Sequence, residues 1–152
     1  MIIKIIKWIL VILCMISIFL FSADTSDESD LKSNGLIIRI AEVLAGRKLN
    51  DAEKDEKIEK YVVLVRKGAH FSIYFLLGFL IINLLVEYRE ESWKTLFFAF
   101  VLSFFYACSD EFHQLFVPGR SGNIIDVWID SIGSYVGVLF YHFIYLIRRK
   151  YE

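Results

Sequence analysis

The sequence contains little cysteine. Only Cys14 and Cys108 occur among its 152 residues, and both lie inside apolar runs. Isolated cysteines of this kind exclude a disulfide framework and a thiolate zinc motif, so we interpret both as small packing residues. Positive charge is not in excess either, because 17 lysines and arginines balance 18 acidic residues, and this excludes a broadly basic nucleic-acid-binding protein. The eight glycines form no phosphate-binding loop, so a nucleotide-binding signature is absent as well.

Long apolar runs are what the sequence has in abundance. Hydrophobic residues make up 57% of the chain, and the charged residues gather in the segments between the runs. A helix that crosses a bilayer needs about 20 predominantly apolar residues. Four segments approach this length: residues 5–23, 68–86, 93–112 and 123–147. We therefore predict an all-α integral membrane four-helix bundle, formed by a single domain over residues 1–152.

The first apolar segment has two interpretations. Two lysines before an apolar stretch that ends in small residues are also typical of a cleaved signal peptide. A cut after Ala23 would place the bulky Phe21 at position −3, where such cleavage sites have a small residue. We therefore predict that this segment is retained as a membrane anchor.

A hydrophilic stretch, residues 24–66, separates the first two spans. Its acidic start, residues 24–30, indicates a solvated turn region. Apolar residues at helical spacing then lead to Gly46 and predict a short amphipathic helix on the membrane surface. Asn50 followed by Glu53 is typical of a helix start, and we expect this second helix to continue into the second span.

Basic residues indicate the orientation in the membrane. Lys4 and Lys7 lie at the start of the first span and residues 148–150, all basic, follow the fourth, whereas the loop 115–122 contains only Arg120. The first loop, with Arg66 and Lys67 at its end, carries nine basic residues against ten acidic ones. Cytoplasmic segments carry the excess of lysine and arginine in multi-pass proteins. Both termini are therefore predicted to be cytoplasmic.

Polar and ionisable residues occur at those ends of the spans that share one face of the membrane. In a four-span protein, the end of the first span, the start of the second, the end of the third and the start of the fourth lie on the same side. The residues in these segments and in the last connecting loop are Arg66, Lys67, His70, Tyr74, Asp110, Glu111, His113, Gln114, Arg120, Asp126 and Asp130. The number of crossings therefore predicts that they gather at one membrane face.

On the last three spans, small residues lie on the same side of the helix as the polar residues, further along its axis. At about 100° per residue, Asp126, Asp130, Gly133 and Gly137 fall on one stripe of the fourth span. Small residues mark the places where membrane helices approach closely, so we expect the polar residues in the bundle interior. The Gly133-x-x-x-Gly137 spacing also occurs in dimer interfaces, but we favour packing within one chain.

Clustered carboxylates at this position need neutralisation, because ionisable groups at membrane depth are costly. Three interpretations remain open, namely a structural ion-pair network, a ligand-binding or catalytic site, and a divalent-metal site. The residue types that bind metals lack HExxH-like spacing. The signal for a metal site is therefore weak, so we assign no metal ligands, and the sequence does not identify a cofactor.

Three separated motifs carry a resemblance to a known family. They are Arg66-Lys67-x-x-His70-Phe71-x-x-Tyr74, Asp110-Glu111-x-His113-Gln114-x-Phe116-x-Pro118-Gly119-Arg120 and Asp126-x-x-x-Asp130-x-x-Gly133. In this order they resemble the VanZ-like family, over about residues 61–147. The resemblance implies a multi-pass protein of the bacterial cytoplasmic membrane with a role in the cell envelope. It also implies a link to reduced susceptibility to the glycopeptide antibiotic teicoplanin.

Our first functional hypothesis is a protein that binds, or acts on, an anionic envelope lipid or glycolipid headgroup at the extracytoplasmic face. The candidates for acid–base chemistry are His70, Asp110, Glu111 and His113. The candidates for substrate or anion binding are Arg66, Lys67, Tyr74, Gln114, Arg120, Asp126 and Asp130. Backbone N–H groups at the start of the fourth span, after Gly122, add an expected helix N-terminal anion site.

The alternative hypothesis is a non-catalytic membrane protein. Its polar cluster would then be a structural ion-pair network or a site for a protein partner. A small transporter is less favoured, because its ionisable residues would be expected near the bilayer midplane. Here they gather toward one end of the spans.

Overall fold

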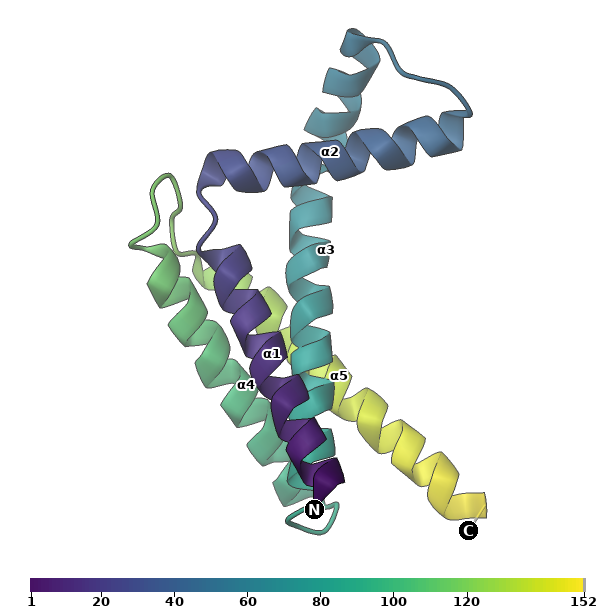
Figure 1. Cartoon of the computed structure of the whole chain (residues 1–152), viewed down its shortest axis with the longest axis vertical. Coiled ribbons are helices and arrows are strands. Elements are labelled where there is room, and N and C mark those ends of the chain that lie inside the picture. Colours follow the sequence, from purple (N-terminus) through teal and green to yellow (C-terminus); the bar gives the residue numbers. More distant parts are fainter. Residues whose placement is uncertain (152) are drawn as a thin grey trace.

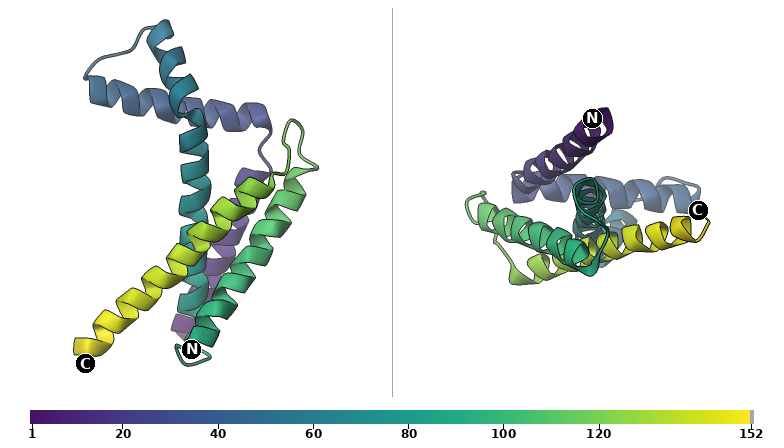
Figure 2. Two further views of the ribbon diagram at one scale, coloured as in Figure 1. Left: turned by 180° about the vertical axis from the view of Figure 1, so that it is seen from behind. Right: turned by 90° about the horizontal axis from the view of Figure 1, so that it is seen from below.

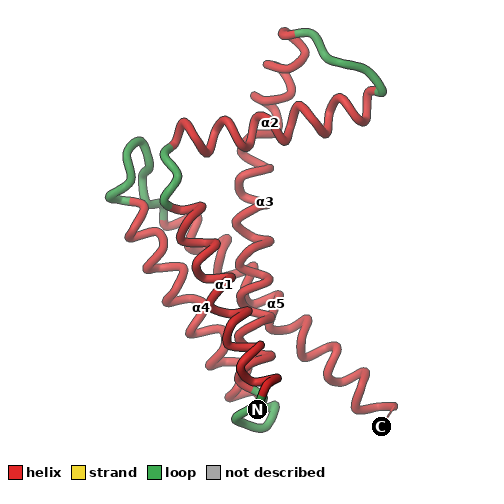
Figure 3. The backbone as a smooth tube through the Cα atoms, viewed as in Figure 1, coloured by secondary structure: helices red, strands yellow, loops and turns green. Residues whose placement is uncertain are grey.

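The computed structural model describes residues 1–151 and shows five helices (Figure 1). They are α1 (Ile2–Ser22), α2 (Ser26–Ala45), α3 (Asp51–Leu85), α4 (Trp93–Gln114) and α5 (Ile124–Tyr151). The described chain has no strand, and the loops lie at the ends of the helices (Figure 3). The predicted all-α architecture is therefore confirmed.

Four of the helices, α1, α3, α4 and α5, are long and apolar enough to cross a membrane, as the sequence predicts. Helix α3 is much longer than its predicted span, 68–86, because its helical conformation begins at Asp51. Its 35 residues extend over about 52 Å, against about 30 Å for the apolar part of a bilayer. The charged N-terminal part of α3 therefore projects beyond the bundle (Figure 1). The expected helix that starts after Asn50 and continues into the second span is confirmed.

The prediction of a turn region over residues 24–30 is wrong. Helix α2 begins at Ser26, because Thr25 and Glu28 form a reciprocal capping box that satisfies free N–H groups of the first turn. The helix ends where Gly46 adopts a left-handed conformation, with φ of 65°. It lies across α3 in both side views (Figures 1 and 2). Apolar side chains near its C-terminus, including Val43 and Leu44, are exposed, which suits a helix that rests on the membrane surface.

The closest backbone contacts of the bundle lie between α3 and α5, which cross each other in Figure 2. A Cβ atom placed on Gly133 would come within 2.4 Å of the Phe71 carbonyl oxygen, and one on Gly137 within 2.0 Å of the Phe75 carbonyl oxygen. On α3, a Cβ on Gly78 would lie 2.3 Å from the Ser134 carbonyl oxygen. The preferred interpretation of the glycine spacing, packing within one chain, is confirmed.

The N-terminus, the α3–α4 loop and the C-terminus lie at the same end of the bundle (Figure 1). Lys4 and Lys7 donate hydrogen bonds to the carbonyl oxygens of Glu87 and Asn83, near the C-terminus of α3. Cations at this position bind carbonyl groups that have no partner in the helix, and they interact favourably with the helix dipole. The polar residues of the three motifs lie toward the opposite end, where the first loop and the α4–α5 loop lie.

The glycine contacts give a first testable prediction. Gly137→Ala should lower the stability of the protein by about 1–3 kcal/mol, because a methyl group there meets backbone atoms that cannot rotate away. Gly68→Ala is the matched control on α3, since a Cβ at that position meets nothing within 4 Å. Thermal unfolding of both variants in detergent measures the difference. Equal melting temperatures for the two variants would contradict the close α3–α5 contact.

Candidate functional site

A crevice of about 500 Å³ lies between α1, α2 and α3, at the polar end of the bundle. Its apolar walls include Ile18 and Phe21 of α1, Leu36 of α2 and Ile73 of α3. Its polar lining includes Arg66, His70, Tyr74, Asp110 and Arg120. The crevice therefore combines a hydrocarbon-like surface with a group of charged side chains, and its size is that of an ordinary ligand pocket.

Two arginines lie in the crevice with different partners. Arg66 donates a hydrogen bond to the Asp30 carboxylate over 3.0 Å. Arg120 instead donates to backbone carbonyl oxygens, from Nε to Asp24 over 3.2 Å and from Nη2 to Phe21 over 3.4 Å. Burial and the like charge of Arg66 lower the pKa of Arg120. Within residues 1–151, Arg120 forms no salt bridge, so its charge is available to a ligand anion.

Two buried hydroxyl groups lie beside Asp110 on the crevice wall. The side chain of Tyr74 is fully buried, and its hydroxyl has no hydrogen-bond partner. The same holds for the buried hydroxyl of Ser22 on α1. Asp110 lies beside both groups, outside regular hydrogen-bond geometry. The Asp110 carboxylate is therefore the nearest acceptor for both hydroxyl groups.

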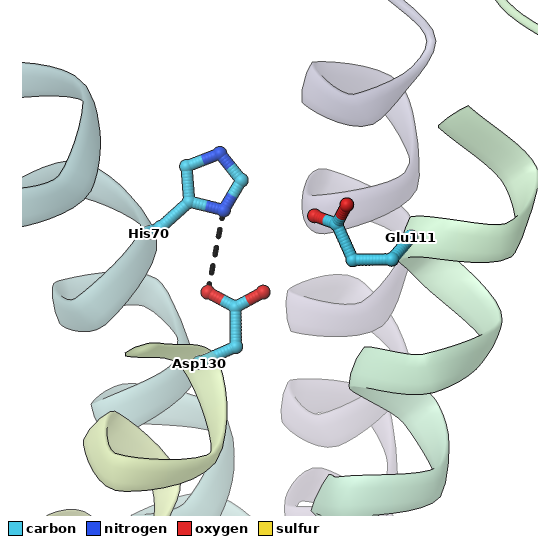
Figure 4. Close-up of side chains that lie close together, drawn as sticks. All are labelled: His70, Glu111 and Asp130. Atoms are coloured by element: carbon cyan, nitrogen blue, oxygen red, sulfur yellow. Dashed lines mark hydrogen bonds and ion pairs between the residues drawn. The ribbon is translucent and has the colours of Figure 1, made fainter. Parts of the chain in front are cut away.

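Behind this wall, His70, Glu111 and Asp130 meet from three different helices, as Figure 4 shows. The Nδ1 atom of His70 lies 3.3 Å from Oδ1 of Asp130. The Asp130 side chain is fully buried, and its other oxygen, Oδ2, has no hydrogen-bond partner. We call these three residues the carboxylate–histidine cluster. His70 belongs both to this cluster and to the residues that line the crevice.

The N-terminus of α5 does not match the expectation of a free anion site. The Glu111 side chain accepts a hydrogen bond from the Asn123 N–H over 2.9 Å, and the Asn123 side chain accepts one from Ile125 over 3.0 Å. A carboxylate of the protein itself therefore occupies this position, which the helix dipole makes favourable for an anion. Gln114 holds the second oxygen of Glu111 through its amide, over 3.1 Å.

The remaining site residues lie outside the crevice. Lys67 and Asp126 form an ion pair of 3.0 Å between α3 and α5. His113 packs its ring against Phe19 of α1, with ring centroids 4.6 Å apart, and it is not part of the carboxylate–histidine cluster. The structure thus divides the predicted set into crevice residues, a buried cluster and structural contacts.

Sequence reasoning missed three residues of the first loop and α2. The backbone carbonyl of Asp24 accepts a hydrogen bond from Arg120, and the Asp30 carboxylate binds Arg66. The Asp24 carboxylate also pairs with Lys32 over 2.5 Å. One signal was present in the sequence, since these acidic residues directly follow the first span and so share a membrane face with the two arginines. Charge complementarity across that face identifies them as partners.

A family model described as VanZ/LLP1 matches residues 7–146. This range includes all four membrane-crossing helices in whole or in large part, and every residue of the site. No curated protein and no solved structure matches the chain.

The shared membrane face of the site can be tested by cysteine labelling. In a variant without Cys14 and Cys108, we expect Lys48→Cys and Pro118→Cys to react with a membrane-impermeant maleimide from one side of the membrane. Both positions are exposed in loops at the crevice end. Glu90→Cys, in the exposed α3–α4 loop, should react only from the other side. Labelling of Lys48→Cys and Pro118→Cys from opposite sides would disprove the arrangement of the bundle.

Proposed function

The chain belongs to the VanZ/LLP1 family, and on this premise we propose that it binds an anionic lipid or glycolipid of the bacterial cell envelope by its headgroup. The headgroup contacts Arg120, Arg66 and Tyr74 in the crevice, and the first part of the hydrocarbon chain follows the apolar wall. The single observation that carries the proposal is the half-buried Arg120, which has no carboxylate partner within the described residues and lies beside a second arginine.

The guanidinium groups of Arg120 and Arg66 are the donors that an anion would bind in this position. Arg120 and Arg66 repel each other, whereas the carboxylates of Asp24, Glu111 and Asp30 favour the charge of Arg120 without forming a salt bridge to it. A phosphate group accepts charge-assisted hydrogen bonds from guanidinium groups in a bidentate manner.

The apolar part of the crevice favours a lipid over a small soluble anion. Ile18, Phe21, Leu36 and Ile73 line it, and they come from two membrane-crossing helices and from α2. A ligand with a charged end and a hydrocarbon part would satisfy both kinds of surface. The position of the crevice at the polar end of the bundle also suits a molecule whose headgroup lies at the membrane surface.

The distribution of basic residues favours an extracytoplasmic position for the crevice, with both termini in the cytoplasm. Lipid-linked precursors of the cell wall are exposed at that face, so the proposal offers a physical reason for a link to teicoplanin susceptibility. Of the four side chains expected to carry acid–base chemistry, His70 and Asp110 line the crevice and face the headgroup. Glu111 and His113 do not line it.

The proposal predicts that Arg120→Gln weakens headgroup binding at least tenfold, because it removes charge-assisted hydrogen bonds of about 1.5–3 kcal/mol. The probe is dihexanoyl phosphatidylglycerol, titrated into the purified protein in detergent by calorimetry. Arg149→Gln is the matched control, since this exposed arginine lies at the other end of α5.

Two outcomes would contradict the proposal. One is equal binding by Arg120→Gln and Arg149→Gln. The other is equal affinity of the wild-type protein for dihexanoyl phosphatidylcholine, which has the same chains and no net charge. In cells, teicoplanin susceptibility and the profile of lipid-linked precursors, measured with both variants at matched expression, extend the test to the envelope.

A structural ion-pair network is the second candidate, and the Lys67–Asp126 pair favours it for part of the cluster. This pair joins α3 to α5 outside the crevice, and both side chains are partly exposed. Asp126→Ala should therefore cost no more than about 1 kcal/mol of stability, and Asp126→Glu should keep the stability of the wild type. Thermal unfolding and the phosphatidylglycerol titration, done on both variants, check that only stability changes. Loss of headgroup binding in Asp126→Glu would show that this pair belongs to the binding site.

A further inference from the structure

From the carboxylate–histidine cluster we infer a second, inorganic ligand: His70, Glu111 and Asp130 bind one divalent transition-metal ion, with Zn²⁺ preferred. The inference goes beyond headgroup binding, because the ligand atoms of the cluster carry it by themselves. The sequence predicts no metal here, since the three residues are 19 to 60 positions apart and form no local motif. Only the packing of α3, α4 and α5 brings them together.

The geometry suits a metal ion of this size. One potential ligand atom from each of the three residues lies within 4.8 Å of the other two, and Nδ1 of His70 is 3.3 Å from Oδ1 of Asp130. Zinc binds nitrogen and oxygen at about 2.0–2.2 Å, so neighbouring ligands of a tetrahedral site lie about 3.3–3.6 Å apart. The His70–Asp130 edge already has this length. In Figure 4 the Glu111 carboxylate points toward the same place from the opposite side.

The charges around the cluster point to a cation. Asp130 has no exposed surface, and its Oδ2 atom is without a hydrogen-bond partner. The cations nearest in the chain are engaged elsewhere, since Lys67 pairs with Asp126 and Arg66 with Asp30. Two buried carboxylates therefore face a single imidazole. A buried charge without compensation costs several kcal/mol, and a divalent ion would compensate both carboxylates.

The surroundings also hold the ligands in place. Glu111 is fixed by the Asn123 N–H and by the amide of Gln114, and such outer contacts orient metal-binding carboxylates. The mixture of one imidazole and two carboxylates selects the metal, because Mg²⁺ and Ca²⁺ prefer oxygen ligands alone, whereas zinc accepts both nitrogen and oxygen. Water would complete the coordination, as in zinc sites with three protein ligands.

A second histidine–carboxylate pair serves as an internal comparison. His142 contacts Glu91 at the other end of the bundle. No third metal-binding residue joins this pair, because within residues 1–151 only His70, Glu111 and Asp130 form a group of three. His142 therefore tests whether a histidine–carboxylate contact alone suffices.

The test uses the full-length protein in detergent, treated with a chelator and then titrated with Zn²⁺ by calorimetry. We expect one ion per chain in the wild type, a loss of affinity of at least 100-fold in Asp130→Asn and in His70→Ala, and no change in His142→Ala. No binding by the wild type, or equal binding by Asp130→Asn, would overturn the inference. The two carboxylates would then share a proton in place of a metal.

A measurement on the wild type alone covers the case in which the variants do not fold. X-ray absorption at the zinc edge should show a first shell of nitrogen and oxygen neighbours at about 2.0–2.2 Å, the outer-shell scattering of one imidazole, and no sulfur. A sulfur neighbour would place the ion at Cys14 or Cys108 and overturn the assignment. The phosphatidylglycerol titration separates the two proposals, because Arg120→Gln should retain zinc binding while it loses headgroup binding.

Discussion

The close crossing of α3 and α5 is the constraint on which the polar end of the bundle depends. Gly133 rests on the Phe71 carbonyl, and Gly137 rests on the Phe75 carbonyl one helical turn further along each helix. Phe71 directly follows His70, and Asp130 lies three residues before Gly133. The glycine contacts therefore fix the distance between a histidine on one helix and a carboxylate on the other. Any larger residue at these positions separates the backbones and with them the two polar side chains.

The low dielectric of the bundle interior then determines the partners of the polar groups. A carboxylate in this environment is stable only with a cation or with hydrogen-bond donors around it. Glu111 obtains donors from the start of α5, where the free N–H groups of a helix favour negative charge. Asp126 forms an ion pair with Lys67 at the edge of the bundle. Asp130 has only His70, and for this reason it is the group on which the inference of a bound cation rests.

The sequence predicted the four membrane-crossing helices because hydropathy and the number of crossings do not depend on side-chain packing. The four spans and the gathering of the motif residues toward one end follow from these two properties. The rotation of each helix about its own axis does not follow from them. His113 and Glu111 are two residues apart on α4, about 200° around the helix, so they cannot both face the same cluster. His113 faces Phe19, and only the packed structure shows this.

The first loop was predicted least well, and the reason is local. Its acidic residues suggested a turn by composition, whereas the Thr25–Glu28 capping box makes the same segment a helix start. Once α2 is formed, Asp30 lies one turn into a rigid element and can hold Arg66 across the crevice. The roles of Asp24 and Asp30 depend on this tertiary arrangement. The sequence predicts that these acidic residues share a membrane face with the two arginines, but it does not predict which acidic residue contacts which arginine.

The shared position of His70 has a consequence for the two proposed ligands. Its ring lines the crevice and also contacts Asp130 in the cluster, so both sites are joined through one side chain. A cation held by the cluster would add positive charge to the side of the crevice that His70 lines, and Arg66 and Arg120 line the same crevice. An anionic headgroup is then held more firmly, and by thermodynamic linkage the headgroup increases the affinity for the cation by the same factor. A cation that neutralised the buried carboxylates would thus also strengthen the proposed binding of an anionic headgroup in the crevice.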